Sequence, residues 1–284
     1  MLAARSGLCR KKGRRSNRAR RRREDPGDRL NETRSVWISA GRHESSPSVM
    51  KNTPNFERVI EQLFSHLVSG ERRAARNLVD TVYEAGIAPE TVAKDVFWPV
   101  LEMVTSLYRK DQITQLSHQY ATRILRMLVD QGQARYTQRN ERNQRICMFC
   151  GPNESEELAG QLVADLLEAD GYEITFAGGG VANDEIREEL SQRDPHVLLL
   201  FASSAKDAPF IRELIDGIRE NGAYGQLQIV VGGGIFNRAP GLAEEIGADV
   251  CAASPSDLLE KLVTERKVRN DRFSAVAARH RRVA

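Results

Sequence analysis

The chain has 284 residues, of which 40% are hydrophobic and 29% are charged, with a formal net charge of +3 at pH 7. This composition is ordinary for a globular protein with a real core, arranged as one large domain or two modest ones. No apolar run approaches the roughly 18 residues that a membrane-spanning helix needs, so we expect no membrane helix.

Basic residues are concentrated at the start of the chain. Residues 1–49 contain 14 Lys and Arg against 5 Asp and Glu, whereas the remainder contains 28 against 34. The block RKKGRRSNRARRRRE has almost no apolar content, which predicts a disordered tail over residues 1–49 that contacts nucleic acid through phosphates. Met50 opens MKNTPNFERVIEQLF, which is equally typical of a natural start, so a mis-assigned start stays open as the alternative.

The four cysteines are scattered along the chain. Cys147 and Cys150 have CxxC spacing but lie in an apolar strand pattern, and no second pair completes a zinc site, which favours a buried structural role. The sparse cysteines and the lack of an apolar signal core indicate a reducing, cytoplasmic setting.

Residues 54–136 have helical periodicity. Four amphipathic segments with short connections predict a small antiparallel bundle. Gly70 and Gly86 are expected to end the first two helices, and Pro99 to kink or break the third. The segments are PNFERVIEQLFSHLVSG, ERRAARNLVDTVYEAG, APETVAKDVFWPVLEMVTSLYRKD and ITQLSHQYATRILRMLVDQGQARY.

After a polar linker at 137–144, residues 145–266 alternate between apolar strands and helices. The expected strands are RICMFC, YEITFAG, HVLLLFA, QIVVGG and ADVCAA, with the helix after the fourth strand placed over APGLAEEIG. Five β–α units of this size predict an α/β domain with a flavodoxin-like, doubly wound, five-stranded parallel sheet. Residues 267–284 are predicted to be a basic, frayed tail.

GPNESEELAG (151–160) lies where an expected strand end meets a helix N-terminus, the place where open α/β sheets bind ligands. Glu154, Glu156 and Glu157 fall in the first helical turn. We interpret them as the complement of the helix dipole rather than as an acid/base pair.

A helical bundle that precedes a flavodoxin-like domain resembles the cobalamin-binding module of corrinoid methyl-carrier proteins, methionine synthase and B12-dependent regulators. The likeness covers residues 54–265. PVLEMVTSLYRKDQITQLSH keeps the module's Pro99 and His118, has Tyr108 at its Trp position, and has Ser117 where Glu is usual. The resemblance implies that Tyr108 and His118 lie over the upper face of a corrin, with His118 as an upper-face ligand to cobalt.

The same module carries Asp-x-His-x-x-Gly after its first strand, where the His ligates cobalt from below and the Asp fixes its tautomer. Gly160 keeps the glycine, but Ser155 replaces the Asp and Glu157 replaces the His. A glutamate oxygen is a poorer ligand than imidazole for cobalt in a nitrogen-rich ring. The resemblance therefore implies cobalamin without the usual lower histidine.

A further departure follows the third expected strand. Phe201 stands where the family has a Ser that hydrogen-bonds the buried nucleotide tail of the cofactor. Ser203 and Ser204 are close enough to substitute, or else Phe201 plugs the slot. After the fourth strand, Gly232, Gly233 and Gly234 are compatible with close approach to a ligand or with a tight turn alone.

Other catalytic motifs are missing from the sequence. It has no GxGxxG, P-loop, GxSxG or His-Glu-x-x-His pattern, so we expect no catalytic residues and no enzyme activity of its own. Phe97 and Trp98 are interpreted as bundle packing. His66 and His196 are interpreted as incidental.

These observations favour a cobalamin-binding sensory or regulatory protein with an unidentified protein partner. One alternative is a corrinoid methyl carrier that works with a separate methyltransferase, at most a carrier subunit. Another is an interaction module that kept the fold and lost the cofactor, with DNA as a partner if the basic tail exists.

Overall fold

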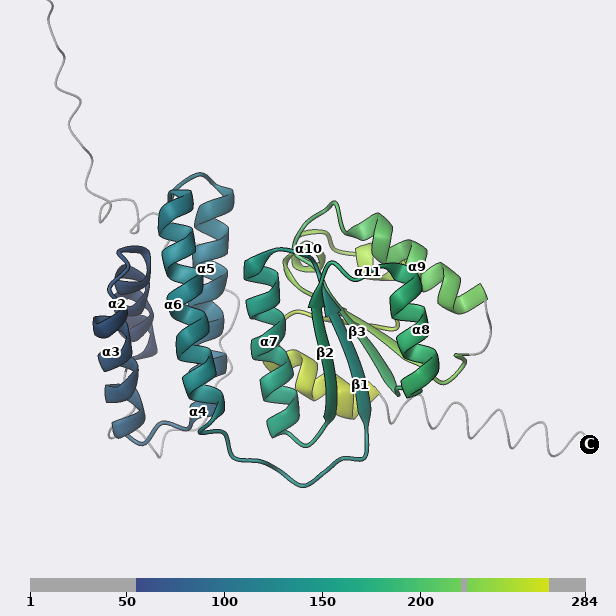
Figure 1. Cartoon of the computed structure of the whole chain (residues 1–284), viewed down its shortest axis with the longest axis horizontal. Helices are drawn as coiled ribbons and strands as arrows, with labels where there is room; N and C mark the ends of the chain where they lie inside the picture. Colours follow the sequence, from purple (N-terminus) through teal and green to yellow (C-terminus); the bar gives the residue numbers. More distant parts are fainter. Residues whose placement is uncertain (1–54, 221–223, 266–284) are drawn as a thin grey trace, which may run out of the picture. The chain divides into compact units, whose positions relative to one another are not determined.

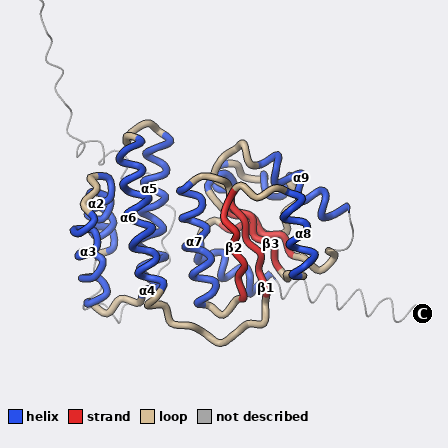
Figure 2. Tube along the Cα trace, in the orientation of Figure 1, coloured by secondary structure: helices blue, strands red, loops and turns tan. Residues whose placement is uncertain are grey.

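The computed structural model describes residues 55–220 and 224–265. Within them an N-terminal set of helices precedes an α/β domain (Figures 1 and 2), as the sequence predicts. The predictions for residues 1–49, for Met50 and for residues 267–284 lie outside the described residues.

The bundle helices begin and end at recognisable signals. Asn55 and Thr114 cap two helices by accepting hydrogen bonds from the backbone N–H groups of Arg58 (3.4 Å) and Ser117 (3.1 Å), which satisfies donors that a helix start leaves free. The helices are α2 (Phe56–Val68), α3 (Arg72–Glu84), α4 (Pro89–Val92), α5 (Trp98–Arg109) and α6 (Gln115–Gln133).

The predicted break at Pro99 is a π-helical segment. The segment η1 (Ala93–Phe97) separates α4 from α5, and Pro99 lies in the first turn of α5. Proline has no N–H to donate and tolerates the first turn of a helix, so the regular ladder is interrupted just before it. Phe97 is fully buried in the bundle, whereas Trp98 packs against Phe201 of the α/β domain.

The α/β domain contains a five-stranded, all-parallel sheet of order β2-β1-β3-β4-β5. This confirms the flavodoxin-like prediction, with the topological switch point between β1 and β3. The strands are β1 (Arg145–Cys150), β2 (Glu173–Gly179), β3 (Val197–Phe201), β4 (Gln228–Gly232) and β5 (Val250–Ala252).

Different helices cover the two faces of the sheet. Alternate residues of β3 point to opposite faces. Leu199 packs with α7 (Glu154–Ala169), the helix at 255–265 and the bundle core, whereas Leu200 packs with α8 (Asn183–Arg193) and α9 (Ala208–Glu220). Helices α5 and α6 also contact α7, so the bundle core continues onto one face of the sheet.

The segment after β4 differs from the prediction. A short helix, α10 (Gly234–Arg238), begins directly at the strand end, and the helix expected over APGLAEEIG is only α11 (Leu242–Glu245). Gly233 has a φ of 104°, and its carbonyl accepts hydrogen bonds from the next turn. The chain therefore enters a helix at once and leaves it before Pro240.

None of the helices in the described part of the chain is both long and apolar enough to cross a membrane.

Candidate functional site

The carboxyl end of the sheet meets the bundle through residues that the sequence singled out. His118 Nε2 lies 2.9 Å from the hydroxyl oxygen of Ser155, so the start of α6 is hydrogen-bonded to the first turn of α7. The Tyr108 ring stacks on the His118 ring, with centroids 4.1 Å apart. Burial lowers the pKa of His118, which favours the neutral ring. The positions expected above and below a corrin are thus in direct contact.

Glu157, at the position of the lower histidine, takes part in a polar contact between α6 and α7. Its carboxylate lies 3.9 Å from Arg126 Nη2. Arg126 also donates to Gln161 Oε1 (3.1 Å) and to the Glu154 carbonyl (3.4 Å). Glu157 is therefore held as one side of an ion pair.

Glu156 does not fit the interpretation of the acidic turn as a simple helix-dipole complement. Its side chain is only 3% exposed. One carboxylate oxygen accepts the Ser203 backbone N–H (2.7 Å), and the other accepts Asn153 Nδ2 (3.1 Å). Burial raises the pKa of Glu156, and these hydrogen bonds lower it. The residue ties the loop after β1 to the loop after β3, a partnership that no local sequence signal announces.

The place that the resemblance assigns to the nucleotide tail is filled by two aromatic rings. Phe201 is 7% exposed, and the Trp98 ring packs edge-on against it with centroids 6.2 Å apart. Beside them, bounded by Val163, Leu199 and Leu258, a cavity of only about 20 Å³ remains. A space of this size holds about one water molecule. Trp98 therefore packs across the domain contact, and not only within the bundle as predicted.

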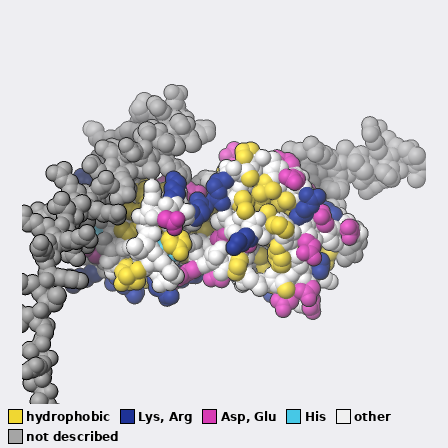
Figure 3. Space-filling view, turned by 90° about the horizontal axis from the view of Figure 1, so that it is seen from above, with side chains coloured by type: hydrophobic (Ala, Val, Ile, Leu, Met, Phe, Trp, Pro, Cys, Tyr) yellow, Lys and Arg dark blue, Asp and Glu magenta, His cyan; other side chains and the backbone are white. Residues whose placement is uncertain are grey.

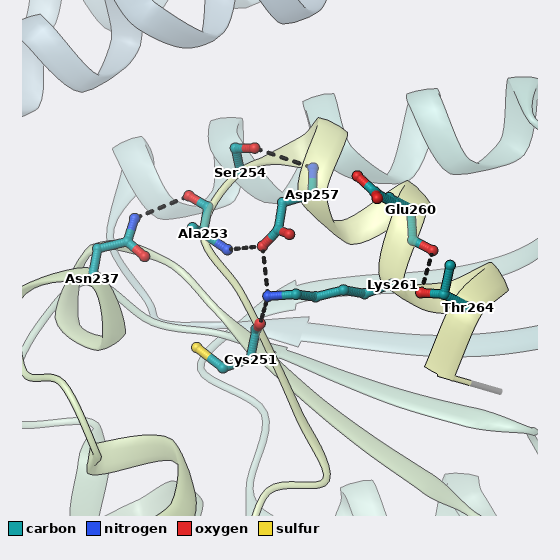
Figure 4. A network of polar contacts seen from close by, with 8 residues as sticks. All are labelled: Asn237, Cys251, Ala253, Ser254, Asp257, Glu260, Lys261 and Thr264. Atoms are coloured by element: carbon teal, nitrogen blue, oxygen red, sulfur yellow. Dashed lines mark hydrogen bonds and ion pairs between the residues drawn. The ribbon is translucent and has the colours of Figure 1, made fainter. Parts of the chain in front are cut away.

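The outer wall of this slot is held by hydrogen bonds around the end of β5 (Figure 4). Lys261 Nζ donates to the Cys251 carbonyl (2.7 Å) and pairs with Asp257 Oδ2 (2.9 Å), which also accepts the Ala253 N–H (2.8 Å). Asn237 Nδ2 donates to the Ala253 carbonyl (3.0 Å). The turn that borders the slot is thus tied to both the following helix and α10.

The backbone of Ser203 and the hydroxyl of Ser204, the predicted tail-binding serines, are hydrogen-bonded within the protein. The Ser203 N–H is bonded to Glu156, and its carbonyl accepts Arg238 Nη2 (2.5 Å). The Ser204 hydroxyl oxygen accepts the Lys206 N–H (3.3 Å). These hydrogen bonds hold the loop after β3 to α7 and α10.

The glycines of this region serve close packing. A Cβ at Gly160 would lie 2.8 Å from the Phe176 ring, so the glycine lets α7 approach β2. A Cβ at Gly233 would lie 2.3 Å from the Ala202 carbonyl oxygen. Gly232 has the Ala252 carbonyl oxygen 3.3 Å from the corresponding point. Packing alone accounts for these three glycines.

Two arginines converge over the third glycine of the GGG run. A Cβ at Gly234 would lie 2.7 Å from Arg238 Nη1 and 3.5 Å from Arg109 Nη1, on α10 and α5 respectively. Burial and the charge of Arg109 lower the pKa of Arg238. No local sequence pattern predicts this pair, because only the fold brings the two segments together.

Comparisons with known proteins identify the family. A family profile described as "B12 binding domain" matches residues 145–263, and a second profile with the same description matches residues 59–131. The chain belongs to the cobalamin-binding module family. The two matches confirm the predicted resemblance, and they confirm cobalamin as the cofactor class.

Among curated relatives of this module, monomethylamine corrinoid protein 2 of Methanosarcina acetivorans is 22% identical over 214 residues, covering 73% of this chain and 95% of the relative. Monomethylamine corrinoid protein 1 of Methanosarcina mazei is 19% identical over 207 residues, covering 71% and 94%. The solved structure of the Methanosarcina barkeri monomethylamine corrinoid protein matches with a TM-score of 0.55 at 17% identity, covering 71% and 95%. That match supports the fold.

The residues present do not fit cobalamin with its nucleotide tail inserted in the domain and a lower histidine on cobalt. Phe201 and Trp98 occupy the place that the resemblance assigns to the tail, and Glu157 stands where the resemblance expects the histidine. The His118–Ser155 hydrogen bond also closes the space between the bundle and α7.

Other singled-out residues lie outside this site. His66 pairs with Glu71 (2.6 Å), and His196 Nδ1 accepts the Arg145 N–H (3.0 Å), so both have local structural partners. Cys147 is buried and Cys150 half-buried, and burial raises their thiol pKa values to about 11 and about 12. Across residues 55–220 and 224–265, no group of three or more His, Cys, Asp or Glu is arranged to hold a metal ion.

Proposed function

We propose that this protein is a corrinoid-responsive regulatory protein whose bundle and α/β domain separate when a corrinoid enters between them. The observation that carries the proposal is the hydrogen bond between His118 and Ser155. It joins the two domains at the place where the family resemblance puts the cofactor. A ligand that binds only the open form shifts the equilibrium away from the closed one, so its presence becomes a change of conformation.

The corrinoid in this proposal keeps its own base, because the slot for the tail is filled. Arg109 and Arg238 supply positive charge at the edge of the sheet, beside Ser203. Such a pair suits the phosphodiester of a nucleotide loop that stays outside the domain. Tyr108 and His118 remain the candidate contacts on the bundle side, with His118 the candidate cobalt ligand.

The output in this proposal is recognition of one of the two forms by a protein partner. Exposed aromatic and aliphatic side chains occur on α5 and α6, at Tyr108, Leu116 and Tyr120. Separation of the domains would change the surroundings of Tyr108, which stacks on His118, whereas Tyr120 lies beside Gly70 within the bundle. We keep the cytoplasmic setting predicted from the sparse cysteines as part of the proposal.

A second candidate, a corrinoid methyl carrier, is favoured by the relatives, which are monomethylamine corrinoid proteins and are covered over 94–95% of their length. This chain lacks the lower histidine at position 157. A carrier cycles cobalt between strongly reducing and alkylated states, and the lower histidine helps to tune that cycle.

To test the proposal, the full-length chain is mixed with hydroxocobalamin and desalted, and the retained corrinoid is recorded. The distance between the two domains is then measured. Spin labels at Gln119→Cys on α6 and Glu185→Cys on α8 report that distance in a background of Cys9→Ser and Cys251→Ser. The raised thiol pKa values keep Cys147 and Cys150 protonated and poorly reactive at neutral pH.

The proposal predicts retained corrinoid and a longer label-to-label distance. Retained corrinoid with an unchanged distance would support the carrier instead. Absence of any retained corrinoid would contradict both cobalt functions and leave the interaction module.

A further inference from the structure

A cavity lies on the face of the sheet opposite the filled slot. It has a volume of about 370 Å³ and opens at the carboxyl ends of β1 and β3, between α8 and α9. Its walls are mainly apolar, formed by side chains such as Phe149, Leu200, Ile186 and Leu214. In Figure 3 hydrophobic side chains also gather on the α/β part of the molecule. Small-molecule pockets are typically about 300–1,000 Å³ and mostly apolar, with a few polar groups.

One polar group in this cavity has an unused hydrogen-bonding atom. Asp207 lines the cavity, and its Oδ2 is buried without a hydrogen-bond partner among the described residues. Burial raises the pKa of the Asp207 carboxyl. A buried carboxylate oxygen with no donor is costly, so such atoms in native proteins are normally satisfied by water, an ion or a ligand.

The charge around this oxygen selects the kind of donor. A Cβ at Gly151 would lie 1.9 Å from Glu156 Oε2 and 3.0 Å from Asp207 Oδ2, so two carboxylates lie on the same side of this glycine. Glu156 is already bonded to Ser203 and Asn153, whereas Asp207 Oδ2 is free to accept. Lys206, the cation that lines the cavity, is itself exposed. The part of the cavity beside Gly151 therefore favours a positively charged donor.

We propose that this cavity binds a small organic cation, with an apolar body between α8 and α9 and one primary ammonium group that pairs with the Asp207 carboxylate. The proposal does not depend on corrinoid binding, because the cavity and the contact between the bundle and α7 lie on different faces of the sheet.

Benzylammonium is a suitable probe, with benzoate as the matched anion of similar size. Binding to the full-length chain at neutral pH, without corrinoid, is measured by isothermal titration calorimetry and by ligand-observed NMR. We expect benzylammonium to bind at least tenfold more tightly than benzoate. Asp207→Asn keeps the side-chain size and removes the charge, and we expect it to weaken benzylammonium binding at least tenfold.

Two further variants keep the test decisive. Asp216→Asn removes an exposed carboxylate from the same helix, α9, and should leave the affinity unchanged. Ala182→Phe narrows the mouth of the cavity at an exposed residue and should weaken binding without altering Asp207. The proposal is overturned if benzylammonium does not bind at millimolar concentration, or if folded Asp207→Asn binds it as tightly as the unaltered chain.

Discussion

The two faces of the sheet differ in the space that their side chains leave at the carboxyl end of β3. On the α7 face, Phe201 and Trp98 leave a cavity of about 20 Å³. On the α8 and α9 face, the cavity measures about 370 Å³. The backbone topology is that of the family, with the strand order expected for this fold. A few side chains, rather than the fold, therefore decide which face can admit a ligand.

The largest effect on stability is expected from removing the Phe201 ring on the α7 face. Phe201→Ala should lower the free energy of unfolding by about 3–5 kcal/mol, because it removes a buried ring and leaves a cavity. Chemical denaturation measures this change. Phe210→Ala is the control on the other face, since Phe210 is 41% exposed, and it should cost much less. Equal losses for the two variants would show that the Phe201 ring is not packed as described.

Glu156, which joins the loop after β1 to the loop after β3, provides the next test. Glu156→Ala removes the acceptor for the Ser203 N–H and should destabilise the chain by about 1.5–3 kcal/mol, the range for hydrogen bonds to charged groups. Glu156→Gln keeps an acceptor and should lose less. Thermal unfolding compares the two, and an alanine variant as stable as the glutamine variant would contradict the proposed tie between the loops.

A buried carboxylate on α7 makes the stability of the folded chain depend on pH. Burial, with Glu168 and Asp130 nearby, raises the pKa of Asp165 from 3.8 to about 7. The folded chain then binds more protons than the unfolded chain between these values, so its stability should fall as pH rises through this range and level off above about 7.

Asp165→Asn should abolish that part of the slope and raise Tm at pH 8. Each kcal/mol corresponds to roughly 2–4 °C for a chain of this size class. Thermal unfolding from pH 4 to 8 measures the difference, with Asp184→Asn, at an exposed residue of α8, as the control. Parallel curves for the Asp165 variant and the unaltered chain would contradict the pKa assigned to Asp165.

The smallest effect on stability is expected at the contact that closes the module. Ser155→Ala removes the hydrogen bond to His118 and should cost about 0.5–1.5 kcal/mol. If that bond holds the closed form, its loss should tighten apparent hydroxocobalamin binding by about two- to tenfold. Equilibrium titration measures this, with Ser65→Ala on the exposed side of α2 as the control. Unchanged or weaker binding would mean that the bond does not oppose entry.

The sequence predicts much of this architecture, because periodicity and turn residues act locally. Strand β1 matches the expected RICMFC segment, and Gly70 and Gly86 follow the ends of α2 and α3 with positive φ. Pro99, in the first turn of α5, likewise marks the break before that helix through its local backbone effect. The start of α10 was missed, because the Gly233 carbonyl turns the chain into a helix where the pattern resembled a loop.

The candidate site is predictable only in part. The family register pointed to His118, Tyr108 and Ser155, which the fold brings together. The burial of Glu156 depends on the Ser203 N–H, 47 residues later in the chain. The contact of Trp98 with Phe201 likewise joins distant segments. Such pairings arise from tertiary packing and leave no pattern in neighbouring residues.

The absorption spectrum of bound methylcobalamin tests the central claim most directly. The full-length chain and its Phe201→Ser variant are each mixed with the cofactor, desalted and compared with free methylcobalamin at neutral pH. Because Phe201 and Trp98 fill the place that the resemblance assigns to the tail, the unaltered chain should retain the cofactor with a base-on spectrum, and the variant should shift toward base-off. A base-off spectrum for the unaltered chain would show that the tail enters despite Phe201, and would contradict the claim.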